Sequence, residues 1–186
     1  MESILNTAAW LFFGSEVLLF LMKRSKSNET KIREGKSSVI ILWLVITLSV
    51  FAAVYSSSNY PRSEQYLSLI WMGSLILLFG FIIRWTAVFQ LKKAFTVDVA
   101  ISHDHKLKKD GLYKKLRHPA YLGLLLEFLG LSFLFNSWLP LLLLNIPIFL
   151  GLVYRMSIEE EILKNNFGEE YKSYMKNTNK ILPGIY

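Results

Sequence analysis

Long apolar runs separated by short polar segments dominate the pattern of this 186-residue chain. Five runs can be marked, and their approximate bounds are Ile4–Met22, Val39–Tyr55, Tyr66–Phe89, Ala120–Phe135 and Trp138–Tyr154. A helix needs about 20 apolar residues to cross a bilayer, so the pattern predicts five transmembrane helices, of which the last two are short. Only the polar pair Asn136-Ser137 separates these two, which predicts a tight turn and a helical hairpin.

Lysine and arginine are distributed unevenly among the polar segments. Segment 23–36 contains six of them, 91–118 contains eight and 155–186 contains five, whereas 56–65 contains only Arg62. Because basic residues accumulate on the cytoplasmic side of membrane proteins, we expect the N-terminus outside and the three basic segments in the cytoplasm. The first apolar run has its basic residues after it rather than before it, the reverse of a signal peptide, so we expect a retained helix.

The composition agrees with a single integral-membrane domain. Hydrophobic residues make up 53% of the chain and charged residues only 19%. The net charge of +7 does not indicate nucleic-acid binding, because the basic residues cluster between apolar runs. There is no cysteine, which excludes disulfides, thiol nucleophiles and thiolate metal sites.

The connector Gln90–Pro119 is too long for a plain turn and contains all three histidines of the chain, His103, His105 and His118. Their spacing does not match the His-x3-His pattern that places two imidazoles on one helix face. We therefore predict no metal site, and loop histidines in a basic stretch are commonly just solvated.

The sequence Arg117-His118-Pro119 marks the start of the fourth apolar run. Proline is favoured in the first turn of a helix, which would place His118 at the cytoplasmic mouth of a transmembrane helix. The free amides of that turn, with Arg117 beside them, could hold a carboxylate or phosphate. Tyr121 lies near the same face, and an interfacial arginine–tyrosine anchor would explain the pattern equally well.

A second polar cluster follows the fifth apolar run. Arg155 and Glu159 have the i,i+4 spacing of a helical ion pair, and Glu160 and Glu161 come next. An exposed pair would contribute only a few tenths of a kcal/mol, about 0.3–0.5 in a helix. However, three consecutive acids point around more than half of a helix, so at least one should face the bundle and need a cationic partner.

Two further acids, Glu16 and Glu127, fall inside apolar runs. Acidic side chains are costly inside a membrane, which makes both of them functional candidates. A buried hydrogen bond to a neighbouring helix would explain each of them as well.

Taken together, the polar motifs resemble the isoprenylcysteine carboxyl methyltransferase family, which includes many small bacterial and archaeal members. In order, the motifs are His105-Lys-Leu107, Gly111-Leu-Tyr113, Arg117-His-Pro-Ala-Tyr121, Arg155-x3-Glu159-Glu160, Phe167-Gly-Glu-Glu-Tyr171 and Leu182-Pro183. Their order, spacing and membrane context agree over about half of the chain, and the three predicted N-terminal helices show no comparable signature.

The resemblance implies an all-α integral membrane protein with five transmembrane helices, a cytoplasmic cofactor-binding connector and a C-terminal helical tail. Residues 1–89 would form three N-terminal helices, and 90–186 would form the catalytic region with two more. The implied cofactor is S-adenosylmethionine. The residues implied to bind it are His105, Lys106, Leu107, Lys108, Tyr113, Arg117, His118, Pro119, Tyr121, Glu159 and Glu160.

Two of these implied roles concern the chemistry itself. Glu159 would meet the cationic end of the cofactor, and Arg155 would position the carboxylate of the substrate. The chain departs from the family pattern at Lys108, where an aliphatic residue is usual, and at Asp98, where some members have an amide. Methyl transfer from a sulfonium to a carboxylate needs positioning and a dry site more than an acid or base, so the lack of a catalytic dyad is no objection.

The resemblance also implies a lipid-like, prenylcysteine-type substrate that enters sideways from the bilayer, while the cofactor comes from the cytoplasm. We expect a protein of the prokaryotic inner membrane, with membrane lipids and no nucleic acid as partners. The alternatives are a phospholipid amine methyltransferase, an enzyme of the sterol-reductase type, and a non-catalytic membrane ligand-binding protein. Binding of S-adenosylmethionine or of NADPH would separate the methyltransferases from the reductase.

Overall fold

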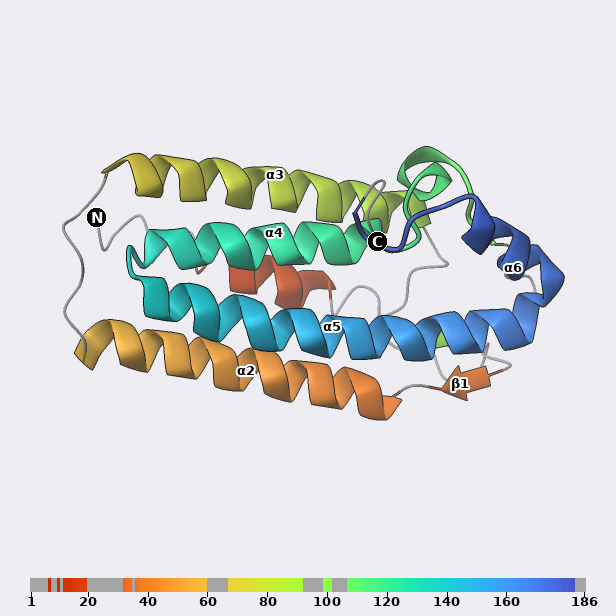
Figure 1. Cartoon of the computed structure of the whole chain (residues 1–186), viewed down its shortest axis with the longest axis horizontal. Helices are drawn as coiled ribbons and strands as arrows, with labels where there is room; N and C mark the ends of the chain where they lie inside the picture. Colours follow the sequence, from red (N-terminus) through yellow and green to blue (C-terminus); the bar gives the residue numbers. More distant parts are fainter. Residues whose placement is uncertain are drawn as a thin grey trace.

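A bundle of long helices forms the body of the protein. The computed structural model describes residues 7, 10, 12–19, 32–34, 36–59, 67–91, 99–101 and 107–182. The elements are β1 (Ile32–Glu34), α2 (Lys36–Asn59), α3 (Leu67–Leu91), β2 (Val99–Ile101), the 3-10 helix η2 (Gly111–Lys114), α4 (Pro119–Leu134), α5 (Trp138–Phe167) and α6 (Glu169–Lys176). Residues 12–19 are also helical. The long helices lie side by side in the order α3, α4, α5 and α2 (Figure 1).

The long helices have the length and polarity of membrane spans. Within the described residues, α2, α3 and α5 are long and apolar enough to cross a membrane, and α4 is apolar but shorter, with 16 residues. Large apolar side chains such as Leu48, Phe51, Trp71 and Leu75 are exposed on the outer faces, where lipid would cover them. Helices are thus confirmed in the last four apolar runs, and the count of five spans stays a prediction.

Several helix ends lie beyond the apolar runs that predicted them. The second run was predicted to end at Tyr55, but α2 continues to Asn59. Ser56 donates its hydroxyl to the carbonyl of Ala53, and the Asn59 amide donates to the carbonyl of Tyr55. These polar side chains satisfy their own hydrogen-bonding groups on the helix backbone, so polar residues are accommodated in the last turn, which hydropathy does not detect.

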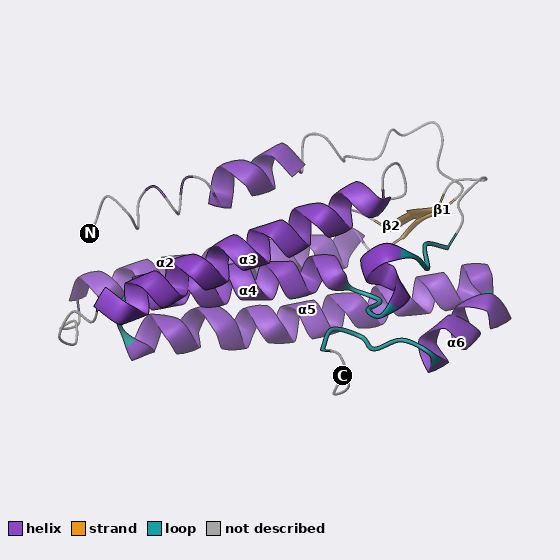
Figure 2. Cartoon of the chain, turned by 90° about the horizontal axis from the view of Figure 1, so that it is seen from above, coloured by secondary structure: helices purple, strands orange, loops and turns teal. Residues whose placement is uncertain are grey.

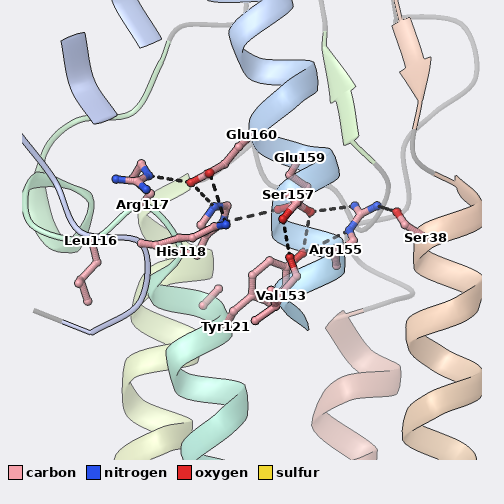
Figure 3. Close-up of polar contacts among 12 residues, drawn as sticks. Ser38, Leu116, Arg117, His118, Tyr121, Val153, Arg155, Ser157, Glu159 and Glu160 are labelled. Atoms are coloured by element: carbon pink, nitrogen blue, oxygen red, sulfur yellow. Dashed lines mark hydrogen bonds and ion pairs between the residues drawn. The ribbon is translucent and has the colours of Figure 1, made fainter. Parts of the chain in front are cut away.

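The predicted hairpin is formed by α4 and α5. The turn between them contains Asn136, whose positive φ of 50° reverses the chain. Pro147 lies inside α5 without ending it, and the helix continues 13 residues beyond the predicted end at Tyr154, to Phe167. As a result, the start of α4 and the polar end of α5 lie side by side at one end of the bundle (Figures 1 and 3).

Four glycines bring α3 and α4 into backbone contact, and we call this contact the glycine seam. They are Gly73 and Gly80 on α3, and Gly123 and Gly130 on α4, so each pair is seven residues apart. A Cβ atom added at Gly123 would lie 2.6 Å from the backbone nitrogen of Arg84, and one at Gly80 would lie 2.7 Å from that of Glu127. Small residues allow this approach in membrane helix pairs, where close packing replaces hydrophobic burial.

A short antiparallel ladder joins the start of α2 to the connector between α3 and α4. Ile32 pairs with Ile101 and Glu34 pairs with Val99. Figure 2 shows the two strands near the end of the bundle where η2 and α6 also lie. The N-terminal half of the chain therefore contacts the connector.

Candidate functional site

His118 lies at the N-terminal end of α4, as its sequence context predicts. It is the residue before the helix, and Pro119 is the first helical residue. The His118 side chain is buried, and its ring stacks on that of Tyr121 with 5.6 Å between the ring centroids. The two imidazole nitrogens face two neighbouring carboxylates of α5, Glu159 and Glu160 (Figure 3).

Glu160 is held by three basic side chains. Its Oε1 accepts a hydrogen bond of 2.7 Å from Nε of Arg117 and lies 3.3 Å from Nε2 of His118. Its Oε2 lies 3.6 Å from Nζ of Lys180. Of the three consecutive acids, Glu160 is therefore the most buried and has the cationic partners that its burial requires, whereas Glu161 is exposed.

Glu159 binds a tyrosine and an arginine. The Tyr121 hydroxyl donates to Oε1 of Glu159 at 2.6 Å, and NH2 of Arg155 lies 2.8 Å from the same oxygen. The other oxygen, Oε2, lies 3.6 Å from Nδ1 of His118. The Glu159 side chain is 16% exposed, so this carboxylate is more accessible than that of Glu160.

Arg155 joins three helices. Its guanidinium contacts Glu159 on its own helix α5, donates from Nε to the Tyr121 hydroxyl of α4 at 3.4 Å, and donates from NH1 to Oγ of Ser38 of α2 at 2.6 Å. The Arg155 side chain is only 1% exposed. The pair with Glu159 is thus buried, and the interpretation as an exposed surface ion pair is wrong.

The C-terminal segment is docked onto the polypeptide just before α4. The backbone amides of Arg117 and His118 donate to the carbonyls of Asn179 and Lys180, at 2.9 and 3.1 Å. The Arg117 guanidinium also donates to the carbonyls of Met175 and Thr178. Arg117 therefore links Glu160 to the C-terminal segment, and its donors serve these internal contacts.

Three tyrosines pack beneath this docked segment. The Tyr174 hydroxyl donates to the Tyr113 carbonyl at 2.6 Å, and burial raises the pKa of Tyr174 to about 12, so it remains a donor at neutral pH. Burial likewise raises the pKa of Tyr113 and of Tyr171. The Tyr171 hydroxyl is buried and has no hydrogen-bond partner within the described residues. Tyr171 therefore presents an unused polar group beside Tyr174.

The motif Gly111-Leu-Tyr113 packs against the end of α3. The amide of Leu112 donates to Oε1 of Gln90 at 2.8 Å, and the Tyr113 hydroxyl donates to the carbonyl of Ala87 at 3.4 Å. Gly111 has a φ of 61°, and a Cβ atom there would collide with the Gln90 side chain. Glycine is therefore favoured at this position by its positive φ, and any larger residue would also displace the end of the Gln90 side chain.

The acids inside the apolar runs meet one buried arginine. Glu16 binds Arg84 of α3 through both carboxylate oxygens, each at 2.5 Å. Oε2 of Glu127 lies 4.0 Å from Nε of Arg84, and neither Glu127 oxygen accepts a hydrogen bond from the described residues. A buried hydrogen bond to a neighbouring helix therefore explains Glu16, whereas Glu127 has none from the part of the chain that the structure describes.

The structure brings together most, but not all, of the predicted site residues. Arg117, His118, Tyr121, Glu159 and Glu160 converge with Arg155 (Figure 3). Tyr113 lies under the docked C-terminal segment, and Lys108 pairs with Asp110. His105, Lys106 and Asp98 lie outside the described residues, as does Pro183 of the last motif.

The sequence interpretation missed Ser38 and Lys180. Both side chains contact the cluster from segments to which no role was assigned. No local signal in the sequence marks Ser38, since it is one serine among several on an apolar helix.

The comparisons with known proteins agree with the motifs. Residues 72–165 match the model of the family described as "Isoprenylcysteine carboxyl methyltransferase (ICMT) family". A "Probable protein-S-isoprenylcysteine O-methyltransferase" of Oryza sativa subsp. indica is 25% identical over 94% of this chain and 92% of that protein. A "Methanethiol S-methyltransferase" of Pseudomonas deceptionensis is 30% identical over 79% of this chain and 55% of that protein.

One solved structure, of the eukaryotic intramembrane Ras methyltransferase ICMT, has a similar fold. Its TM-score is 0.64 at 22% identity, and the match covers 83% of this chain and 55% of that one. The chain thus spans about half the length of the solved protein. At this identity the likeness establishes the fold alone.

Proposed function

Because this chain belongs to the isoprenylcysteine carboxyl methyltransferase family, we propose that it is an S-adenosylmethionine-dependent methyltransferase that acts on the carboxylate of a lipid-like, prenylcysteine-type substrate. The observation that carries the proposal is the convergence of Arg155, Glu159, His118 and Tyr121 at the polar end of a membrane bundle. The site combines a cationic and an anionic side chain, as a carboxylate substrate and a sulfonium cofactor would require.

The residues present fit S-adenosylmethionine. Bound there, it would supply a methyl group on a sulfonium. A carboxylate and aromatic faces favour a cationic group, and Glu159 lies beside the stacked rings of His118 and Tyr121. Glu159 is the better candidate for the cationic end, because its side chain is 16% exposed and that of Glu160 only 7%. The Tyr171 hydroxyl, which has no hydrogen-bond partner among the described residues, offers a further polar group.

Arg155 and its surroundings would position the substrate. A guanidinium matches the geometry of a carboxylate, and the burial of Arg155 removes water that would weaken the interaction. Tyr121 contacts both Arg155 and Glu159, so it fixes the distance between the two charged groups. The role of these side chains is to hold two reactants in line and to exclude water, with no proton transfer required.

The chain is an integral membrane protein, and we infer five spans with the N-terminus outside and the site in the cytoplasmic layer of a prokaryotic inner membrane. Three described helices of spanning length and the shorter α4 support the count, and the distribution of lysine and arginine supports the orientation. Reporter fusions after residues 30 and 110 should both read cytoplasmic, and a fusion at residue 59 should read external. Opposite results at two of these positions would refute the topology.

A second candidate differs in the methyl acceptor. One relative at 30% identity is named for methanethiol, which has no carboxylate. If a thiol were the acceptor, Arg155 would have no substrate carboxylate to bind. Comparing methyl transfer to a prenylcysteine analogue and to a small thiol separates the two, because only the first acceptor should depend on the guanidinium of Arg155.

The proposal is tested by cofactor binding and methyl transfer with the purified full chain. We expect binding of S-adenosylmethionine and not of NADPH, and methylation of N-acetyl-S-farnesylcysteine at its carboxylate. His118→Ala and Tyr121→Ala should each weaken cofactor binding, whereas Tyr154→Ala, at an exposed tyrosine of α5, should not. Binding of NADPH alone, or unchanged affinity in both site variants, would refute the assignment.

A further inference from the structure

The start of α2 contacts the proposed site although no motif marks it. Ser38 is the third residue of α2, and it lies outside the residues matched by the family model. Its Oγ accepts a hydrogen bond of 2.6 Å from NH1 of Arg155 (Figure 3). The Ser38 side chain is fully buried, and buried hydroxyl groups are found where they have hydrogen-bond partners.

The packing of α2 against α5 sets this contact. Gly151 lies one turn before Arg155, and Leu42 lies one turn after Ser38. A Cβ atom added at Gly151 would lie 3.3 Å from Cδ1 of Leu42, so the glycine leaves room for the end of the Leu42 side chain between the two helices. The two helices run antiparallel, and their register places the Ser38 hydroxyl level with the guanidinium.

The contacts of Arg155 with Glu159, Tyr121 and Ser38 are not equivalent. Glu159 lies on the same helix as Arg155, and Tyr121 is also the hydrogen-bond partner of Glu159, so these two contacts belong to one local network. Ser38 approaches from a different helix and bonds to a different guanidinium nitrogen. All three nitrogens of the planar guanidinium are therefore held, and Ser38 fixes the edge of that plane that faces α2.

We propose that Ser38 is a positioning residue for methyl transfer: its hydroxyl sets the plane of the Arg155 guanidinium, so that the substrate carboxylate is aligned with the methyl donor. The inference rests on the proposed function, and it extends the site to α2, in the half of the chain where no motif was found. Ser38 acts through Arg155 and needs no contact with the substrate.

The test compares two buried serines of the same helix. Ser38→Ala removes the hydroxyl that Arg155 contacts, whereas Ser56→Ala removes one that bonds only to a carbonyl of its own helix among the described residues. With S-adenosylmethionine and N-acetyl-S-farnesylcysteine, Ser38→Ala should lower kcat about tenfold, because a misaligned reactant raises the barrier, and should leave cofactor affinity unchanged. Ser56→Ala should change neither quantity.

Two results would overturn the proposal. One is a Ser38→Ala enzyme with the kcat of the wild type, and the other is a loss of kcat matched by an equal loss of cofactor affinity, which would indicate a general structural role. A double-mutant cycle of Ser38→Ala with Arg155→Gln, measured by thermal unfolding, tests the contact without any activity. We expect a favourable coupling, and no coupling would refute the contact.

These measurements also separate the two proposals. A wild-type protein that binds S-adenosylmethionine but methylates neither the prenylcysteine analogue nor the thiol would refute the proposed function. The double-mutant cycle would still test whether Ser38 holds Arg155, because it needs no activity.

Discussion

Replacing Arg155 with lysine tests the central contact of the site, because the change keeps the charge and removes the planar group. The guanidinium reaches three partners on three helices, at 2.8 Å to Glu159, 3.4 Å to Tyr121 and 2.6 Å to Ser38. An ammonium is a compact point charge on a flexible stem, and we expect it to keep one of these partners.

The structure sets the expected size of the effect. Loss of two hydrogen bonds to a charged group, each worth about 1.5 kcal/mol at the low end, would destabilise the fold by about 3 kcal/mol. For catalysis, a displacement of about 1 Å in a positioned reactant costs on the order of a hundredfold in rate, or about 2.7 kcal/mol of barrier. Cofactor affinity should survive, because Glu159, His118 and Tyr121 remain.

The assay measures transfer of labelled methyl from S-adenosylmethionine to N-acetyl-S-farnesylcysteine, alongside cofactor affinity and thermal unfolding. Arg84→Lys is the matched control, since Arg84 is also buried and also bound to a glutamate. It should lower stability and leave kcat intact. If Arg155→Lys transfers methyl at the wild-type rate while Arg84→Lys is slow, Arg155 is structural, and the substrate carboxylate must be sought near Arg84 and Glu127.

Two further predictions concern the docked C-terminal segment and the glycine seam. Arg117→Ala should speed hydrogen exchange at the amides of His118 and Asn179 and weaken cofactor binding, because Arg117 links Glu160 to that segment. The control is Lys172→Ala, which removes an exposed ion pair. Equal exchange rates of the two amides in both variants would contradict the contact. Gly123→Ala should destabilise the fold by about 1–3 kcal/mol, since its Cβ would overlap the backbone of Arg84. Gly14→Ala is the control and should not destabilise the fold, because a Cβ at Gly14 would have no atom within 4 Å. Equal unfolding temperatures of the two variants would count against the glycine seam.

Much of the helical framework was predictable because hydropathy and length identify apolar helices. The residues at which the helices end were less predictable. The serines and the asparagine at the end of α2 bond to their own backbone, and the polar end of α5 stays helical while Glu159 and Glu160 contact the start of α4. Both effects depend on hydrogen bonds and tertiary contacts that composition does not report.

The proposed site was predictable to the extent that the hairpin determines it. A chain that leaves one membrane face at Arg117 and returns at Arg155 must bring the two motifs together, and the structure does so. The contact with Ser38 was not predictable, because the register between α2 and α5 depends on side-chain packing. The same holds for the pairing of Glu16 with Arg84, which are 68 positions apart.

The glycine seam also limits how a lipid can reach the site. With Gly130 so close that a Cβ atom would lie 2.5 Å from the backbone nitrogen of Leu77, no acyl or prenyl chain fits between α3 and α4. The two helices therefore form a closed surface on that side of Tyr121. If the proposed substrate is correct, its lipid tail would have to reach the site by a route other than the gap between α3 and α4.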